Sequence, residues 1–230
     1  MKIIPAILTK DFRNIERSID MVSGVVNMVQ IDLCDGVFVP NKTWPYVNGE
    51  PTTDVYFNKL TSEEIGMPHW EQIDIELDLM IAHPLAQLAT LMMIGPKRLV
   101  FHLDSLIASK ESLADLDPYI RENTEIGLAI LPDADISVLD SFLEYISFVQ
   151  VMGIDRVGFQ GQTFDPRVLE TVKAIRAVYP DIQISVDGGV TLETAKMLNE
   201  AGADRLVVGS AIFADHQPML AINTFLRLEE

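Results

Sequence analysis

Short apolar runs alternate along the chain with longer stretches in which apolar and polar residues mix at helical spacing. Short runs of this kind are typical of buried strands, and the mixed stretches predict amphipathic helices that cover them. The predicted strands are residues 3–8, 27–33, 73–80, 99–103, 126–131, 148–152, 182–186 and 205–208. The clearest predicted helices are residues 13–22, 85–93, 167–178 and 192–201.

This succession of eight strand–helix units predicts an α/β fold, a single-domain (β/α)₈ TIM barrel over residues 1–230. An open doubly wound sheet shares the same alternation and is the alternative. The strand count favours the barrel, and so does the lack of a Gly-x-Gly-x-x-Gly turn after the first strand. The length of 230 residues also suits one barrel domain.

The segment 42–72 interrupts this rhythm, because it places several aromatic residues and prolines among polar ones. It is long for a loop and helix between two strands, so we interpret it as an insertion after strand two. On a barrel, the loop after this strand lies at the active face, which predicts a lid or rim for the site. A surface excursion or a contact between subunits is the alternative.

The chain is strongly acidic, with a net charge of −17 at pH 7. Nucleic acid is excluded as a partner, because its phosphate backbone requires a basic face and none is visible. No apolar stretch of about 18 residues predicts a membrane span, and the N-terminal apolar run is too short for a signal peptide. The lone cysteine, Cys34, fits a reducing cytosol, so we expect a cytoplasmic protein in which Cys34 is a packing residue.

Two turns near the end of the chain carry the first candidate chemistry. Residues 184–190 and 207–213 each hold a short apolar strand that stops at small residues. These small residues are Gly188, Gly189, Gly209 and Ser210. Glycines after a strand let backbone N–H groups approach a ligand, and a helix N-terminus behind them favours an anion. The two turns predict a phosphate pocket with Asp187 beside it as an acid or base.

Strand side chains alternate between two faces, so residue parity predicts which of them point into the barrel. Four polar side chains fall on inward positions near the carboxyl ends of strands two, three and seven, where TIM barrels place their active sites. They are Gln30, Asp32, Asp78 and Asp187. Burying three carboxylates together is costly unless a cation binds them or some are protonated, and the cation is the simpler solution. Pairing with interior lysines or arginines is the alternative, although few basic residues fall at predicted inward strand ends.

Several motifs occur in the order seen in ribulose-phosphate 3-epimerases, and the chain resembles that family. The specific ones are Asp-Gly-Val-Phe-Val-Pro-Asn at residues 35–41 and Gly-Phe-Gln-Gly-Gln at residues 158–162. A third, Val-Asp-Gly-Gly at residues 186–189, is shared by many phosphate-binding barrels. The resemblance runs from residue 3 to about residue 214, interrupted chiefly by the segment 42–72.

This resemblance implies an isomerase of the pentose phosphate pathway. It would invert C3 of a phosphorylated ketopentose, converting ribulose 5-phosphate to xylulose 5-phosphate. Asp32 and Asp187 would transfer protons on opposite faces of a metal-stabilised enediolate. Backbone groups would hold the phosphate of this small sugar around Gly158, Gln160, Gly161, Gly188, Gly189, Gly209 and Ser210. We also expect a homo-oligomer.

The chain departs from the family at the metal-ligand positions. The family uses two histidines with the two aspartates, whereas Gln30 and Asp78 stand at the histidine positions here. The resulting metal set, with Asp32 and Asp187, offers only oxygen atoms, which favours one Mg²⁺ or Mn²⁺ ion, with Zn²⁺ or Fe²⁺ as alternatives. His102, where the family also has a histidine, either lines the pocket or is a satisfied interior residue.

Two further functions stay open beside this one. The first is an epimerase or isomerase for another phosphorylated ketose, with a pocket reshaped by the insertion. The second is a non-catalytic phosphosugar binder that kept the barrel and lost the metal. The changed histidine positions favour the binder, whereas the presence of both Asp32 and Asp187 favours catalysis, because a binder does not need two opposed carboxyls.

Overall fold

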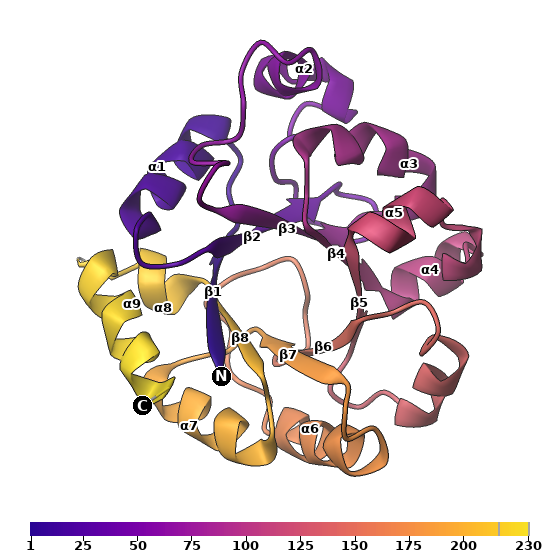
Figure 1. Cartoon of the computed structure of the whole chain (residues 1–230), viewed down its shortest axis with the longest axis vertical. Coiled ribbons are helices and arrows are strands. Elements are labelled where there is room, and N and C mark those ends of the chain that lie inside the picture. Colours follow the sequence, from indigo (N-terminus) through magenta and orange to yellow (C-terminus); the bar gives the residue numbers. More distant parts are fainter. Residues whose placement is uncertain (216, 230) are drawn as a thin grey trace.

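The computed structural model describes residues 1–215 and 217–229. Over these residues, eight parallel strands close a barrel in the order β1-β2-β3-β4-β5-β6-β7-β8, and β8 pairs with β1. The strands ring the centre of Figure 1 and the helices surround them. The (β/α)₈ barrel is therefore confirmed, and the open doubly wound sheet is wrong. The strands are β1 (Lys2–Ile7), β2 (Met28–Cys34), β3 (Asp74–Met80), β4 (Arg98–His102), β5 (Glu125–Ile130), β6 (Phe148–Met152), β7 (Gln183–Asp187) and β8 (Arg205–Val208).

Helices cover the outside of the barrel. The α-helices are α1 (Phe12–Val22), α2 (Val55–Thr61), α3 (Pro84–Leu91), α4 (Leu103–Ser109), α5 (Pro118–Asn123), α6 (Arg167–Val178), α7 (Leu192–Ala201), α8 (Ser210–Phe213) and α9 (Pro218–Leu226). The 3₁₀ helices are η1 (Pro51–Thr53), η2 (Met92–Ile94), η3 (Leu113–Asp115), η4 (Ile136–Ser141) and η5 (Arg227–Glu229). Over the described ranges, none of these helices has both the length and the apolar character needed to cross a bilayer.

Most element bounds lie close to the predicted ones. Each strand begins and ends within one residue of its prediction, and α6 and α7 match theirs. The helix α3 ends two residues before its predicted end, because the chain tightens into η2 and stops at Gly95. Gly95 has a φ of 79°, a left-handed conformation that glycine adopts without a steric penalty and that ends many helices.

The predicted strand faces are confirmed. The outward positions of β2 and β3 pack in the main core between strands and helices, where Ile31 and Leu77 are buried. The inward residues Ile4, Ala6, Met28 and Val207 form a separate apolar cluster inside the barrel. Polar inward residues on β2, β3 and β7 are thereby brought to one end of the barrel.

One aromatic ring fills much of the barrel interior. Phe148 on β6 is completely buried, and a Cβ atom added to Gly127 on β5 would lie 2.8 Å from its Cε1 atom, so only glycine fits there. The guanidinium carbons of Arg205 and Arg98 lie 4.8 Å and 5.9 Å from the ring centroid. The ring therefore packs against the arginines near the amino ends of the strands.

The segment 42–72 contains η1 and α2 and packs on the outside of the barrel (Figure 1). Trp44 is buried, with its ring centroid 5.3 Å from that of Phe12 and 5.9 Å from that of Phe57. Its indole N–H donates to Asp54 Oδ1 at 2.9 Å, and this carboxylate also caps the first turn of α2. These contacts make the segment part of the helical layer. They favour surface packing, and a lid role stays a prediction.

Candidate active site

A cavity of about 370 Å³ lies at the carboxyl ends of the strands. Asp32 at the end of β2 and Asp187 at the end of β7 form part of its lining. The loops after β6, β7 and β8 supply most of the remaining lining. All the residues predicted around the phosphate line this cavity, namely Gly158, Gln160, Gly161, Gly188, Gly189, Gly209 and Ser210.

The four polar side chains predicted to meet inside the barrel do meet. Side-chain oxygens of Asp32, Asp78 and Asp187 lie within 4.8 Å of one another. Gln30 lies between two of these carboxylates, because its Nε2 donates to Asp32 Oδ1 at 2.8 Å and to Asp187 Oδ2 at 2.7 Å. The register of the barrel explains the meeting, since Asp32 on β2 is the direct partner of Asp78 on β3.

His102 is a satisfied interior residue rather than part of the cavity lining. Its Nε2 lies 2.7 Å from Asp78 Oδ1, and both side chains are buried. This contact fixes one oxygen of Asp78. The second oxygen, Oδ2, lies 3.4 Å from Nε2 of Gln150.

Gln150 is a site residue that the sequence analysis missed. It is completely buried on β6, and its Nε2 also lies 3.4 Å from Asp187 Oδ2. The parity rule that found Asp187 would have found it, because position 150 shares the inward face of β6 with Phe148 and Met152. Gln30 and Gln150 thus both direct amide N–H groups at the carboxylate cluster.

The carboxylate cluster has no ion pair with a lysine or arginine among the described residues. Interior arginines do exist, but they lie at the opposite end of the barrel. Arg98 pairs there with Glu76 and Glu125, and Arg205 pairs with Glu125. The sequence analysis missed both arginines, because predicted strand four began one residue after Arg98 and no inward face was assigned to Arg205, the first residue of predicted strand eight.

Burial and mutual repulsion shift the acidity of this cluster. Burial raises the pKa of Asp32 well above its ordinary value, and the charges of Asp187 and Asp78 add to the effect. Burial, followed by the charge of Asp78, raises the pKa of Asp187 to about 7. Without a cation, part of the cluster therefore holds a proton near neutral pH. Burial also raises the pKa of the Cys34 thiol, the opposite of what a nucleophile requires.

The loop after β6 is tied to its surroundings at several points. Asn41 Nδ2 donates to the carbonyl of Gly158 at 2.8 Å, and Gln160 Nε2 donates to the carbonyl of Ala6 at 3.1 Å. A Cβ atom on Gly209 would lie 2.9 Å from Cδ of Gln160, so the Gln160 side chain packs directly on the turn after β8. At the start of α6, Arg167 pairs with Asp165, Asp155 and Asp133.

With this geometry established, comparison with known proteins identifies the family. Residues 2–213 match the model of the ribulose-phosphate 3 epimerase family. The chain belongs to this family. It is therefore a member of a group of enzymes that epimerise carbohydrates.

Relatives of this epimerase-family chain support the assignment over nearly its whole length. It is 28% identical over 218 residues to a ribulose-phosphate 3-epimerase of Schizosaccharomyces pombe, covering 94% of this chain and 89% of the relative. It is 27% identical over 232 residues to the ribulose-phosphate 3-epimerase of Bacillus subtilis, covering 97% of each. A 3-hexulose-6-phosphate synthase from Salmonella typhimurium superposes with a TM-score of 0.64 at 18% identity, covering 99% and 98% of the two chains, and shows the shared fold.

Enzymes of this family use a divalent metal, and the donors present here fit one. The cluster offers three carboxylates whose oxygens are already close together. Gln30 Oε1 is buried and has no hydrogen-bond partner among the described residues, although buried amide oxygens normally have one. Such a set of oxygen atoms suits a hard divalent cation.

Proposed function

We propose that this chain inverts C3 of a phosphorylated ketopentose and interconverts ribulose 5-phosphate and xylulose 5-phosphate. The observation that carries the proposal is the meeting of Asp32 and Asp187, from β2 and β7, in one buried cluster at the cavity floor. Epimerisation requires two acid–base groups, and these two carboxyls are the ones that both line the cavity. Family membership and the names of the relatives support the same reaction.

The two aspartates exchange roles during the reaction. One ionised carboxylate accepts the C3 proton, and the electron pair of the broken C–H bond forms the C2–C3 double bond of an enediolate. The other carboxyl, protonated at the start, delivers its proton to C3 from the opposite face, and the C2 carbonyl forms again. The raised pKa of Asp187, about 7, supports a state in which one member of the pair keeps its proton near neutral pH.

The metal set we propose is Gln30, Asp32, Asp78 and Asp187, with Mg²⁺ or Mn²⁺ favoured by the oxygen donors and Zn²⁺ or Fe²⁺ as alternatives. When bound, such an ion would offset the negative charge that develops on the enediolate oxygens. Gln30 Nε2 now points at Asp32 and Asp187, so the side-chain amide would turn over to offer Oε1, the atom that has no partner among the described residues. His102 would keep Asp78 oriented through the 2.7 Å contact.

The sugar phosphate would be held by backbone groups. No lysine, arginine or histidine lines this cavity in the part of the chain that the structure describes. The lining glycines Gly158, Gly161, Gly188 and Gly189 all have positive φ values, a conformation that exposes main-chain N–H groups in tight turns. The cavity volume of about 370 Å³ suits a small phosphorylated sugar. A cytoplasmic location, a homo-oligomeric state and the exclusion of nucleic acid stay predictions.

A proton-exchange experiment tests this function. Ribulose 5-phosphate is incubated in deuterated buffer with Mg²⁺ or Mn²⁺, and NMR follows deuterium at C3 and the appearance of xylulose 5-phosphate. We expect both with the natural chain and with Asp181→Asn, a control at an exposed aspartate that does not line the cavity. Asp32→Asn should slow both by at least about a hundredfold.

The outcomes separate the three candidate functions. Exchange at C3 of a different ketose phosphate, with none on ribulose 5-phosphate, would show that the enzyme acts on that other sugar. If the chain binds the sugar phosphate but catalyses no exchange with any ion, it is a non-catalytic binder and the proposed enzymatic function is wrong.

A further inference from the structure

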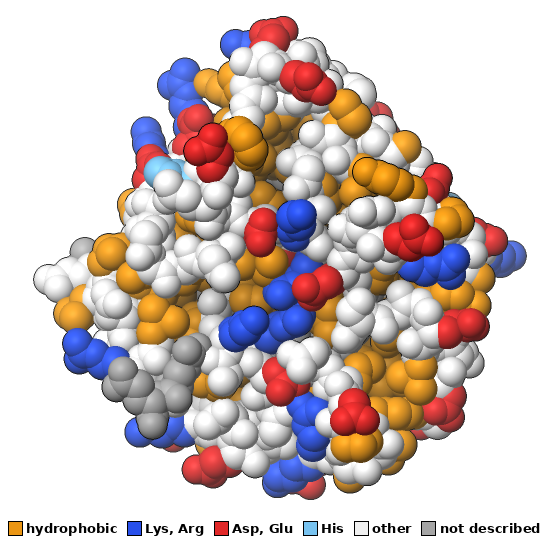
Figure 2. Space-filling view, in the orientation of Figure 1, with side chains coloured by type: hydrophobic (Ala, Val, Ile, Leu, Met, Phe, Trp, Pro, Cys, Tyr) orange, Lys and Arg blue, Asp and Glu red, His pale blue; other side chains and the backbone are white. Residues whose placement is uncertain are grey.

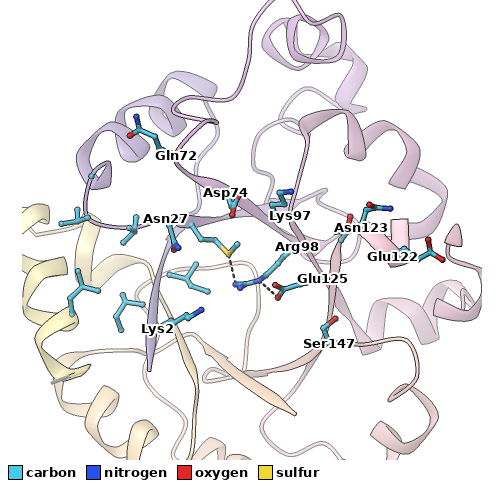
Figure 3. Close-up of a pocket in the computed structure, with 18 of the residues that line it drawn as sticks. Lys2, Asn27, Gln72, Asp74, Lys97, Arg98, Glu122, Asn123, Glu125 and Ser147 are labelled. Atoms are coloured by element: carbon cyan, nitrogen blue, oxygen red, sulfur yellow. Dashed lines mark hydrogen bonds and ion pairs between the residues drawn. The ribbon is translucent and has the colours of Figure 1, made fainter. Parts of the chain in front are cut away.

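A second and larger cavity opens at the amino ends of the strands, with a volume of about 900 Å³. It is the hollow in the middle of the face seen in Figure 2, where lysine and arginine side chains gather. Figure 3 shows that Lys2 from β1 and Arg98 from β4 point toward one another across it. The cavity lies at the opposite end of the barrel from Asp32 and Asp187, so the proposed function does not use it.

The charge of this cavity differs from that of the whole protein. The protein has 17 basic and 34 acidic side chains, whereas the described lining holds four basic and three acidic ones. The basic ones are Lys2, Lys97, Arg98 and Arg121, and the acidic ones are Asp74, Glu122 and Glu125. Among the described residues, Lys2, Lys97 and Arg121 form no ion pair. Their positive charges are therefore available to an incoming group.

Arg98, a lining residue, belongs to a buried ion-pair cluster with Glu125 and with Arg205, which does not line the cavity itself. Arg98 Nε and Arg205 Nη2 both bind one oxygen of Glu125, at 2.7 Å and 3.2 Å. Only 8% of the side chain is exposed in each arginine. Nε and Nη1 of Arg205 are buried and have no hydrogen-bond partner among the described residues. Two guanidinium groups thus share one oxygen of Glu125, Arg98 also binds Glu76 Oε2 at 3.4 Å, and Glu76 Oε1 has no partner among the described residues.

We propose that this cavity binds a multiply charged phosphate compound at a second site, independent of the site at the other end of the barrel. Lysine and arginine commonly bind phosphate oxygens in proteins, and a compound with several such oxygens would accept hydrogen bonds from Lys2, Lys97 and Arg121, the lining residues that form no ion pair among the described residues. Asn27, Asn123 and Ser147 add neutral polar groups to the lining. The volume exceeds what a single inorganic ion needs, so a phosphorylated metabolite fits better than free phosphate.

The test uses pyrophosphate and inorganic phosphate as probes in isothermal titration calorimetry. Ser210→Asp places a negative charge at the other cavity, so that the pyrophosphate bound by this variant reports the second site. We expect Ser210→Asp to bind pyrophosphate more tightly than phosphate, with weaker binding as salt rises. Adding Lys2→Gln and Lys97→Gln should weaken pyrophosphate binding roughly tenfold or more. Lys173→Gln with Lys196→Gln, two exposed lysines outside the cavity, is the matched control and should leave it unchanged.

Three results would overturn the second site. One is equal pyrophosphate affinity with and without the two cavity lysines. Another is loss of all binding in Ser210→Asp alone, which would place the probe at the other cavity. The last is a dissociation constant above about 1 mM for both probes, which would mean that the cavity binds an adventitious ion only. Melting temperatures of all variants identify any that are misfolded.

Discussion

The two ends of the barrel interior are built from the same strands and carry opposite charge arrangements. On β3, Asp78 faces the carboxyl-end cluster, whereas Glu76, two residues earlier, faces the arginines. At the amino end the protein supplies its own counterions, through Arg98, Arg205 and Glu125. At the carboxyl end the aspartates have amide and imidazole neighbours but no described lysine or arginine partner. The carboxyl end, uncompensated by the protein, therefore requires a proton or a ligand, whereas the amino end contains internal ion pairs.

The largest expected effect separates activity from stability at the carboxyl end. Asp187→Asn should lower epimerase activity by about 10²- to 10⁴-fold, because one proton-transfer group is lost. Its melting temperature should equal or exceed that of the natural chain, because a buried carboxylate beside Asp78 is removed. Activity assays and thermal unfolding of the same preparation check both parts. A marked fall in melting temperature would show that the cluster also stabilises the fold.

At the amino end we expect the reverse, a loss of stability without a loss of activity. Arg98→Met should destabilise the protein by about 3–5 kcal/mol, because it leaves buried Glu76 with a weaker counterion environment and removes a partner of Glu125. The folded fraction should keep its activity. Urea unfolding measures the change, with Arg121→Met, an exposed arginine, as the control that stays within about 0.5 kcal/mol. If Arg98→Met lowers the free energy of unfolding no more than the control does, the proposed contrast between the two ends is wrong.

The pH dependence of stability should reveal the uncompensated end. The folded state raises the pKa of Asp187 from 3.8 to about 7, so folded protein binds a proton that unfolded protein releases. The stabilisation this proton gives is complete below pH 3.8 and is lost as pH rises through about 7, by at most about 4 kcal/mol. Urea unfolding with a chelator between these pH values should show the loss, and Asp187→Asn should flatten it. A stability that rises over this range in the natural chain, with no difference in the variant, would contradict the shift.

The smallest effect concerns the ion. Mg²⁺ or Mn²⁺ at a hundred times its dissociation constant should stabilise the natural chain by about 2.7 kcal/mol, since it binds only the folded state. Asp78→Asn removes one proposed ligand, so the same ion concentration should stabilise this variant less. The shift in melting temperature with added ion measures both. Equal shifts in the two proteins would exclude Asp78 as a ligand.

The carboxyl end of the barrel could be predicted from the sequence because two simple rules act there. Strand parity and the position of strand ends bring Gln30, Asp32, Asp78 and Asp187 together whatever the packing details. The amino end was missed because Arg98 lies one residue outside its predicted strand, and because the partners of Arg98 and Arg205 are reached by long side chains that strand parity does not place. Gln150 was missed for a different reason, since the parity rule was not applied to β6, where it places Gln150 on the inward face with Phe148 and Met152.

The segment 42–72 is a third region whose structure the sequence analysis did not predict. From the sequence we interpret its aromatic residues as part of an irregular insertion, because some of their partners lie on α1, far away in sequence. The structure shows Trp44 packed on Phe12 and α2 capped by Asp54. Tertiary contacts turn a stretch without clear periodicity into part of the helical layer.

Phe148 has a consequence for how such a barrel can change over evolutionary time. Its ring packs on the two arginines, and the next inward residue of the same strand, Gln150, already contacts the aspartates. The ring keeps the charged groups of the two ends out of direct contact, while the charge of Glu76 still adds to the raised pKa values of Asp32 and Asp187. A substitution that changes the charge at Glu76 therefore also changes the acidity of the aspartates at the opposite end. One barrel can in this way carry two chemically distinct ends that are separated in space and still coupled through their charges, so their changes over evolutionary time are linked.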